Sequence, residues 1–292
     1  MHKFLKPIGF TKIEKKELDQ IIKDIIDHPQ IIKVAKDSEG NEFAELSREF
    51  AQNIGITVRG TYEEDESFRC EYYYPYFIGT NITTEEQIEI EKHAEKESYA
   101  GICDEIRLGV TLIFYLQNVT DYLSEINRQG KLNHLHGTIL SGLASDAKIL
   151  LPIENKKNYR IDKSYENNDR RNQLIAQARD GDEDAIESLT MEDMDMYTIL
   201  SKRVMREDIF SIVNSYFMPY GIESDQYSIL GEILDYTSEE NHYTNEVIYC
   251  IKVNCNNMVF DICINQQDLM GEPEIGRRIK ANLWMQGSIC LH

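Results

Sequence analysis

The sequence has no apolar run long enough to cross a membrane. Its longest strongly apolar stretch is residues 109–116, whereas a membrane-spanning helix needs about 18–20 such residues. Residues 1–7 lack the apolar core and the small-residue cleavage site of a signal peptide. From these absences we expect a cytoplasmic protein that neither spans nor binds a membrane.

Cysteine and recognisable catalytic motifs are also scarce. The six cysteines are expected to stay reduced in a chain without an export signal, and we interpret them as small apolar residues of strands rather than zinc ligands. The sequence has no Gly-rich phosphate loop, no nucleophile elbow and no paired Cys–His signature. It therefore gives no motif-based reason to assign a reaction, and we expect no cofactor.

Basic residues are few, since 31 Lys and Arg stand against 51 Asp and Glu, a formal net charge of −20. Such a surface repels phosphate backbones and anionic lipid, so electrostatics disfavours nucleic acid as a partner. The composition does support a folded chain, because 41% of its 292 residues are hydrophobic and 10% are aromatic. The expected partner is a protein or a small molecule of unknown identity.

The pattern along the chain predicts an α+β protein in three parts. Residues 154–169 are polar and form the best linker in the sequence. From Tyr220 onward the apolar residues alternate with period two, which is typical of strands. We therefore predict an α+β domain at 1–155, a linker and helical connector at 156–219, and a small antiparallel β-barrel at 220–292.

Within these parts, apolar spacing predicts the individual helices and strands. A strand is expected at 3–10, a helix at 15–27, a polar helix at 84–98, and a hairpin at 137–143 and 147–153. The connector is expected to be helical over 172–179, 182–189, 190–204 and 208–217. Further strands are predicted at 43–50, 54–62, 68–78, 110–116, 227–236, 247–254, 258–265 and 280–291.

Two local compositions suggest contact with a ligand. On a strand, Tyr72, Tyr74 and Tyr76 share one face, where their rings either stack on a planar or sugar ligand or pack in the core. Arg277 and Arg278 lie near the only tryptophan, and a basic loop beside an aromatic strand suits an oligonucleotide, although the surrounding acids oppose one. These five residues are the candidate ligand-facing set.

Five segments carry a family resemblance: 94–101 (AEKESYAG), 112–118 (LIFYLQN), 172–197, 216–221 (YFMPYG) and 271–278 (GEPEIGRR). Together they resemble a family of uncharacterised proteins from gut clostridia, domain of unknown function 3881. The likeness runs nearly from end to end, and the strings are too long to be chance patterns. It implies a bacterial, cytosolic protein and supplies no catalytic residues.

The order of elements in the first part also resembles the paired βαβββ modules of the glyoxalase and dioxygenase class. Sites of that class hold a divalent metal with His and Glu on inward-facing strands. His2, Glu71, Asp104 and Glu154 fall near the corresponding strand ends. The second module is one strand short and only one of the four residues is a histidine, so no metal ligand is assigned.

Three functions are therefore carried forward. The first is a cytosolic bacterial binding or protein-interaction protein without catalytic activity, which fits the acidic surface and the missing catalytic motifs. The second is a metal-dependent enzyme of the glyoxalase-like class. The third is an RNA-associated regulator, which predicts an affinity that falls steeply with salt. We favour the first.

Overall fold

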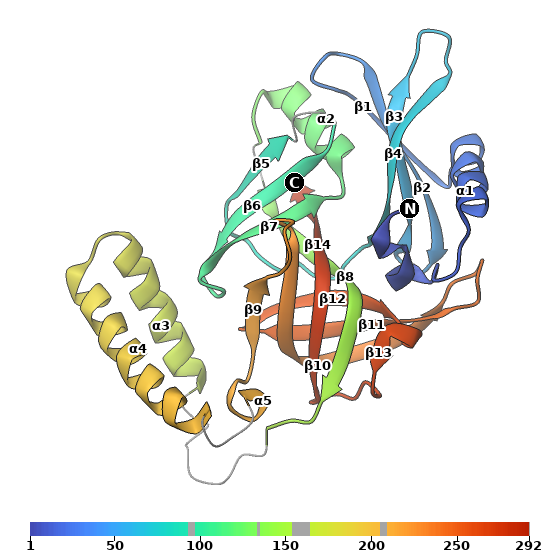
Figure 1. Cartoon of the computed structure of the whole chain (residues 1–292). Coiled ribbons are helices and arrows are strands. Elements are labelled where there is room, and N and C mark those ends of the chain that lie inside the picture. Colours follow the sequence, from blue (N-terminus) through green and yellow to red (C-terminus); the bar gives the residue numbers. More distant parts are fainter. Residues whose placement is uncertain (93–96, 133–134, 154–163, 205–208, 292) are drawn as a thin grey trace.

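Two β-sheets with flanking helices make up the α+β fold, which confirms the predicted class (Figure 1). The computed structural model describes residues 1–92, 97–132, 135–153, 164–204 and 209–291. Among these residues, no helix is both long and apolar enough to cross a membrane.

The chain begins with a 3-10 helix, η1 (Lys3–Ile8), so the strand predicted at 3–10 is wrong. Pro7 has no N–H to donate to a sheet, and Gly9 ends the helix in the left-handed region at φ 86°. A side chain at Gly9 would also collide with Asn241, whose Cβ lies 2.8 Å from the position of an added Cβ. The predicted helix follows as α1 (Lys15–Asp27).

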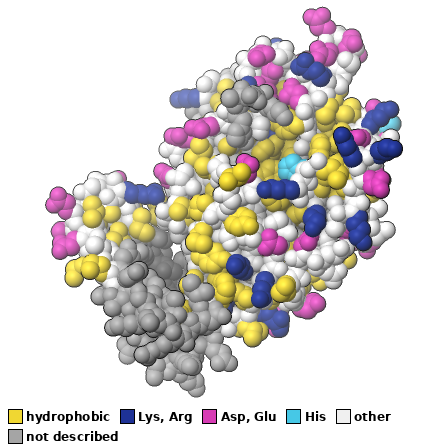
Figure 2. Space-filling model, in the orientation of Figure 1, with side chains coloured by type: hydrophobic (Ala, Val, Ile, Leu, Met, Phe, Trp, Pro, Cys, Tyr) yellow, Lys and Arg dark blue, Asp and Glu magenta, His cyan; other side chains and the backbone are white. Residues whose placement is uncertain are grey.

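The first sheet is an antiparallel meander in the order β1-β2-β3-β4. One part of its surface packs against η1 and α1 in an apolar core that includes Leu18, Leu46 and Ile56. Figure 2 shows acidic side chains at the free end of the β3–β4 hairpin, where the sequence has three Glu and one Asp at 63–66. The strands are β1 (Ile31–Lys36), β2 (Glu42–Ala51), β3 (Ile54–Tyr62) and β4 (Phe68–Phe77).

The second sheet has ten strands, and its pairings close a ring of five: β8, β12, β11, β10 and β14, with β14 returning to β8. Strand β7 pairs with β14 outside the ring and extends the sheet to β6 and β5. The strands are β5 (Ile88–Lys92), β6 (Tyr99–Glu105), β7 (Val110–Leu116), β8 (Leu135–Leu150), β9 (Tyr216–Pro219), β10 (Gln226–Glu240), β11 (Val247–Cys255), β12 (Met258–Asn265), β13 (Leu269–Met270) and β14 (Arg278–Leu291); the short helix η3 (Gln266–Asp268) lies between β12 and β13.

Two predictions in this region are corrected by strand pairing. In place of the polar helix predicted at 84–98, the described residues contain strand β5, because Ile88 is buried and the strand pairs with β6 along its whole length. The hairpin predicted at 137–153 is the single strand β8. Ser145 forms a bulge there instead of a turn, and β14 pairs with β8 on both sides of it.

Helices α3 (Ser164–Arg179) and α4 (Glu183–Val204) form an antiparallel pair that projects away from the sheets (Figure 1). Helix α2 (Val119–Gln129) follows β7, and α5 (Ile209–Ile212) precedes β9. The helix predicted at 208–217 is therefore shorter than expected and gives way to a strand at Tyr216. Most of the predicted linker, residues 154–163, lies outside the described residues.

The division into three domains stays a prediction. Strand β8 comes from the predicted first part, yet it pairs with β12 and β14 of the predicted last part. The large apolar core combines residues of both, including Phe114, Leu140, Ile251 and Met285. The second sheet is thus assembled from distant parts of the chain.

The β11–β12 hairpin places two thiols opposite each other. Asn256 and Asn257 both have positive φ, of 51° and 64°, so a two-residue turn closes on the pair Cys255–Met258. Hydrogen-bonded and non-hydrogen-bonded pairs alternate from there. Cys250 and Cys263, which are directly opposite, therefore form a non-hydrogen-bonded pair with Cα atoms about 4.5 Å apart, within the range that a disulfide spans.

We expect a strong thiol oxidant such as diamide to link Cys250 to Cys263 within one chain. Burial raises the pKa of Cys250 to about 12, and burial also raises the pKa of Cys263, so the reaction should be slow at neutral pH. Peptide mapping by mass spectrometry would detect the linked peptides. Cross-links dominated by other cysteine pairs would contradict this strand register.

Candidate functional site

The register of the first sheet sets a row of charged and polar side chains across its four strands. Lys33 of β1 lies opposite Glu45 of β2, Glu45 lies opposite Arg59 of β3, and Arg59 lies opposite Tyr72 of β4. The neighbouring row on the same face, two residues along each strand, runs through Ile31, Ser47, Thr57 and Tyr74. These two rows face the junction between β7 and α2.

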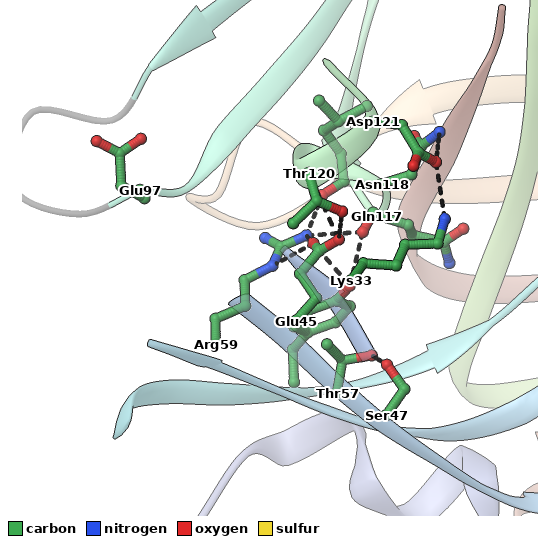
Figure 3. A network of polar contacts seen from close by, with 12 residues as sticks. Lys33, Glu45, Ser47, Thr57, Arg59, Glu97, Gln117, Asn118, Thr120 and Asp121 are labelled. Atoms are coloured by element: carbon green, nitrogen blue, oxygen red, sulfur yellow. Dashed lines mark hydrogen bonds and ion pairs between the residues drawn. The ribbon is translucent and has the colours of Figure 1, made fainter. Parts of the chain in front are cut away.

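Arg59 is the centre of the first row and is completely buried (Figure 3). Its guanidinium pairs with Glu45, with 2.6 Å between Nη2 and Oε1 and 2.8 Å between Nε and Oε1. Nη2 also donates to the carbonyls of Leu116 and Gln117 at 3.0 and 2.7 Å. Because these carbonyls lie at the end of β7 and just before α2, Arg59 fixes that junction to the first sheet.

Three tyrosine hydroxyls complete the surroundings of Arg59. Nη1 donates to Tyr72 and Tyr115 at 3.1 and 2.7 Å, and Nη2 donates to Tyr74 at 3.2 Å. The guanidinium also lies over the Tyr74 ring, 4.5 Å from its centroid, a favourable cation–π contact. Burial raises the pKa of Tyr74 and of Tyr115, so these hydroxyls remain protonated and neutral.

The buried carboxylate of Glu45 is fully engaged. Its Oε1 accepts from Arg59, and its Oε2 accepts from the hydroxyl and the backbone N–H of Thr120, at 2.5 and 3.3 Å. Thr120 lies in the first turn of α2. Since a buried charge is tolerated only when it is paired and hydrogen-bonded, Glu45 and Arg59 act as one structural unit, which we call the Arg59 network.

A cavity of about 300 Å³ lies between the two rows and the start of α2. We call it the β1–α2 pocket. Tyr74 and Tyr76 form aromatic walls, while Ile31 and Ile78 are 42% and 37% exposed. The remaining lining residues are polar and come from both sheets and α2: Lys33, Glu45, Ser47, Thr57, Gln117, Asn118, Asp121 and Ser288.

Most polar groups of the pocket bind one another. The hydroxyls of Ser47 and Thr57 are 2.8 Å apart. Gln117 donates from Nε2 to the Phe77 carbonyl and to Gln286, both at 2.8 Å, and accepts from Ser288 at 2.9 Å. These contacts fix the shape of the walls before any ligand enters.

One ion pair lies where solvent reaches the pocket. Nζ of Lys33 is 2.8 Å from Oδ2 of Asp121, and the two side chains are 45% and 38% exposed (Figure 3). Asn118, which precedes α2, also donates to this carboxylate at 3.1 Å. The pocket therefore has one positive and one negative charge side by side in an exposed position.

The predicted tyrosines are placed on this face of the sheet. Tyr74 and Tyr76 line the pocket, whereas Tyr72 contacts Arg59 and donates its hydroxyl to the Glu97 carbonyl at 2.7 Å. The three residues thus do share a face, and two of the three border a cavity.

The predicted arginines lie elsewhere and already have protein partners. Arg278 is buried and donates four hydrogen bonds to the carbonyls of Leu151, Phe210 and Val213, which attach α5 to the start of β14. Arg277 is paired with Glu274. The structure does not bring these two arginines together with the tyrosines in the pocket.

The residues considered as metal ligands in the sequence lie in different environments. Nδ1 of His2 accepts from the N–H of Phe4, and the ring lies 5.0 Å from that of Trp284. Asp104 accepts from Thr111, and Glu71 lies on β4. Glu154 lies outside the described residues. Within the described ranges, no three His, Cys, Asp or Glu side chains are grouped to hold a metal ion.

His2 is expected to make stability depend on pH. Burial, with Lys3 and the N-terminal amine adding to it, lowers the pKa of His2 from 6.5 to about 4. The unfolded chain then binds the extra proton first, so stability should fall by about 2–3 kcal/mol as pH drops from 6.5 towards 4.

Urea denaturation of the wild type and of His2→Phe at several pH values would measure this contribution. The variant keeps an aromatic ring against Trp284 but should lose the fall in stability over that range. The control His28→Phe, at the exposed end of α1, should keep it. Identical pH profiles for wild type and His2→Phe would contradict the assignment.

A larger hollow of about 660 Å³ lies beside α3. Its ionic groups are Glu85, Glu86, Glu105 and Arg107, and Arg107 donates to both carboxylate oxygens of Glu105 at 2.7 Å. Arg107 also donates to the Thr83 carbonyl. We take the smaller pocket as the candidate site because its walls are more enclosed by the two sheets and it alone combines aromatic walls with an exposed ion pair among the hollows described.

Sequence reasoning missed Arg59, Glu45, Lys33 and Asp121. The predicted strands at 43–50 and 54–62 already imply a tight hairpin that sets Glu45 opposite Arg59, so an opposite-charge pair across this hairpin was the available signal. Nothing in the sequence pairs Lys33 with Asp121.

Comparison with known proteins gives one match. A family model described as "Domain of unknown function, E. rectale Gene description (DUF3881)" covers residues 5–287. This match confirms the resemblance seen in the sequence. No curated protein and no solved structure matches the chain.

Proposed function

We propose a binding function for this chain, which belongs to the DUF3881 family of domains of unknown function. In this proposal the protein is cytosolic and non-catalytic, and it holds a small molecule in the β1–α2 pocket. The observation that carries this proposal is that the ionic groups of the pocket already have partners within the protein. Glu45 is bound by Arg59 and Thr120, and Lys33 is paired with Asp121, so the charged groups of the wall serve to shape the pocket and to bind.

The composition of the pocket supports the same proposal. Small-molecule sites have volumes of about 300–1,000 Å³ and apolar or aromatic walls with a few placed polar groups. The pocket is at the lower end of that range and offers Tyr74 and Tyr76 as walls. Arg59 lies behind this lining and, through Glu45 and the Leu116 and Gln117 carbonyls, holds the parts of the pocket together.

We also infer that the five-stranded ring is a small barrel that supports the far wall. Each of its strands pairs with a ring neighbour on both sides, which leaves no open edge within the ring. Strand β14 belongs to this ring and supplies Ser288 to the pocket. A closed support of this kind would hold Ser288 and Gln117 at fixed distances from the first sheet.

A pair of variants on β1 tests the binding function. Ile31 lines the pocket, whereas Ile32, the next residue, points to the other face of the strand and is 56% exposed. Ile31→Trp should fill the mouth of the pocket, and Ile32→Trp should add the same bulk outside it.

The measurement is ligand-observed NMR of the full chain against a mixture of small organic zwitterions, anions, cations and neutral molecules. We expect at least one compound to bind the wild type and Ile32→Trp, and its signal to be lost with Ile31→Trp. If no compound distinguishes Ile31→Trp from the wild type, the pocket is not a binding site and the proposal fails.

A further inference from the structure

The charges in and directly behind the wall of the β1–α2 pocket differ in whether they can change partner. Glu45 is 4% exposed and Arg59 is 0% exposed, so separating them would leave a charge buried without a partner. Lys33 and Asp121 are 45% and 38% exposed, and an ion pair so exposed contributes little to the stability of the folded chain. Among the ionic groups of the wall, this pair is the one that a ligand can open at low cost.

Opening the Lys33–Asp121 pair leaves both charges in need of a partner. A ligand with only a carboxylate would bind Lys33 but would lie beside the carboxylate of Asp121, and a ligand with only an ammonium would meet the reverse problem with Lys33. A ligand with both charges replaces the pair completely, because its carboxylate takes Lys33 and its ammonium takes Asp121. Charge complementarity of this kind sets specificity.

The rest of the pocket determines the body of such a ligand. Tyr74, Tyr76, Ile31 and Ile78 offer aromatic and aliphatic surface. The nearby hydroxyls of Ser47 and Thr57 are already bound to each other. A polar body would therefore gain few partners for the hydration that it loses, whereas an apolar body would be buried against matching walls.

From this arrangement we propose that the pocket binds a compact zwitterion with an apolar or aromatic body, the chemistry of a hydrophobic α-amino acid. The proposal rests on the binding function above and adds the class of ligand. The ammonium and the carboxylate of such a molecule are separated by a single carbon, which suits two protein charges that lie 2.8 Å apart when they are paired.

The first test compares three probes of similar shape by isothermal titration calorimetry on the full chain. L-phenylalanine carries both charges, 3-phenylpropanoate carries only the carboxylate, and 2-phenylethylamine carries only the ammonium. We expect L-phenylalanine to bind at least about tenfold more tightly than either single-charge probe. A single-charge probe that binds as tightly as L-phenylalanine would overturn the ligand class and leave the binding function intact.

The second test changes the protein charges. Lys33→Gln and Asp121→Asn should each weaken L-phenylalanine binding about tenfold or more, while the control Lys36→Gln, at an exposed position on the same strand outside the pocket lining, should leave it unchanged. Thermal unfolding of each variant shows that it is folded. Unchanged affinity in Lys33→Gln and Asp121→Asn would overturn the inference.

The two proposals fail in distinguishable ways. If the mixed screen finds a ligand that Ile31→Trp excludes but L-phenylalanine and its aliphatic counterpart L-leucine do not bind, the pocket is a binding site for another class and only this inference is wrong. If nothing in the screen and none of the three probes binds the wild type, both proposals are wrong.

Discussion

Replacing Arg59 with methionine is expected to lower the free energy of unfolding by about 3–5 kcal/mol. The variant leaves the carboxylate of Glu45, which is 4% exposed, without its cationic partner. It also removes the donors that hold the carbonyls of Leu116 and Gln117. Urea denaturation followed by circular dichroism would measure the loss.

A double variant separates the buried charge from the packing of Arg59. Glu45→Met together with Arg59→Met removes both charges, and such replacements by apolar residues are often neutral or even stabilising. The double variant should therefore be more stable than Arg59→Met alone. If the double variant is no more stable than the single one, the uncompensated carboxylate is not the cause.

Replacing Phe114 with alanine is the second change for which we expect a large effect, about 3–5 kcal/mol of unfolding free energy. Phe114 is completely buried on β7. Its ring lies against Gly101 and Gly287, where an added Cβ would be 2.1 and 2.6 Å from ring atoms. Both glycines leave room for this ring, so its removal opens a cavity between three paired strands.

The neighbouring residue provides a matched control for the cavity. Ile113 is on the same strand but its side chain is only partly buried, so Ile113→Ala should cost clearly less than Phe114→Ala in the same denaturation experiment. Similar losses for the two variants would show that the strand, and not the ring between the glycines, sets the cost.

Local patterns in the sequence were sufficient for several elements. The strands predicted at 247–254 and 258–265 match β11 and β12 within one residue, because alternating apolar residues flank a short Asn-Asn turn. Helix α1 was predicted over the same residues that form it, because Leu18, Ile21 and Ile25 recur at helical spacing. In both cases the residues that bond to each other are close in the sequence, so the local pattern is enough to predict the element.

Two other strands could not be predicted in this way. Strand β5 is rich in charge and resembles an exposed helix until the next strand, β6, pairs with it. Strand β8 contains residues typical of a turn, and only its pairing with the distant strand β14 shows that they form a bulge. In both cases strand pairing overrides the local propensity.

The residues of the candidate site also divide into those that the sequence could predict and those that it could not. The three tyrosines were identified from their spacing on one strand, and the Glu45–Arg59 pair follows from the β2–β3 hairpin. The Lys33–Asp121 pair could not be predicted, because it joins residues 88 positions apart, one on strand β1 and the other in helix α2. A single sequence gives no means of pairing such residues.

The return of β14 to β8 has a consequence for the order of events during synthesis. Ser141 pairs with Gln286, so the ring stays open until β14 has emerged from the ribosome. Non-local pairing of this kind slows folding, and the waiting strands have unpaired edges that invite association between nascent chains. We therefore expect the yield of folded protein to rise when chaperones shield those edges before β14 emerges.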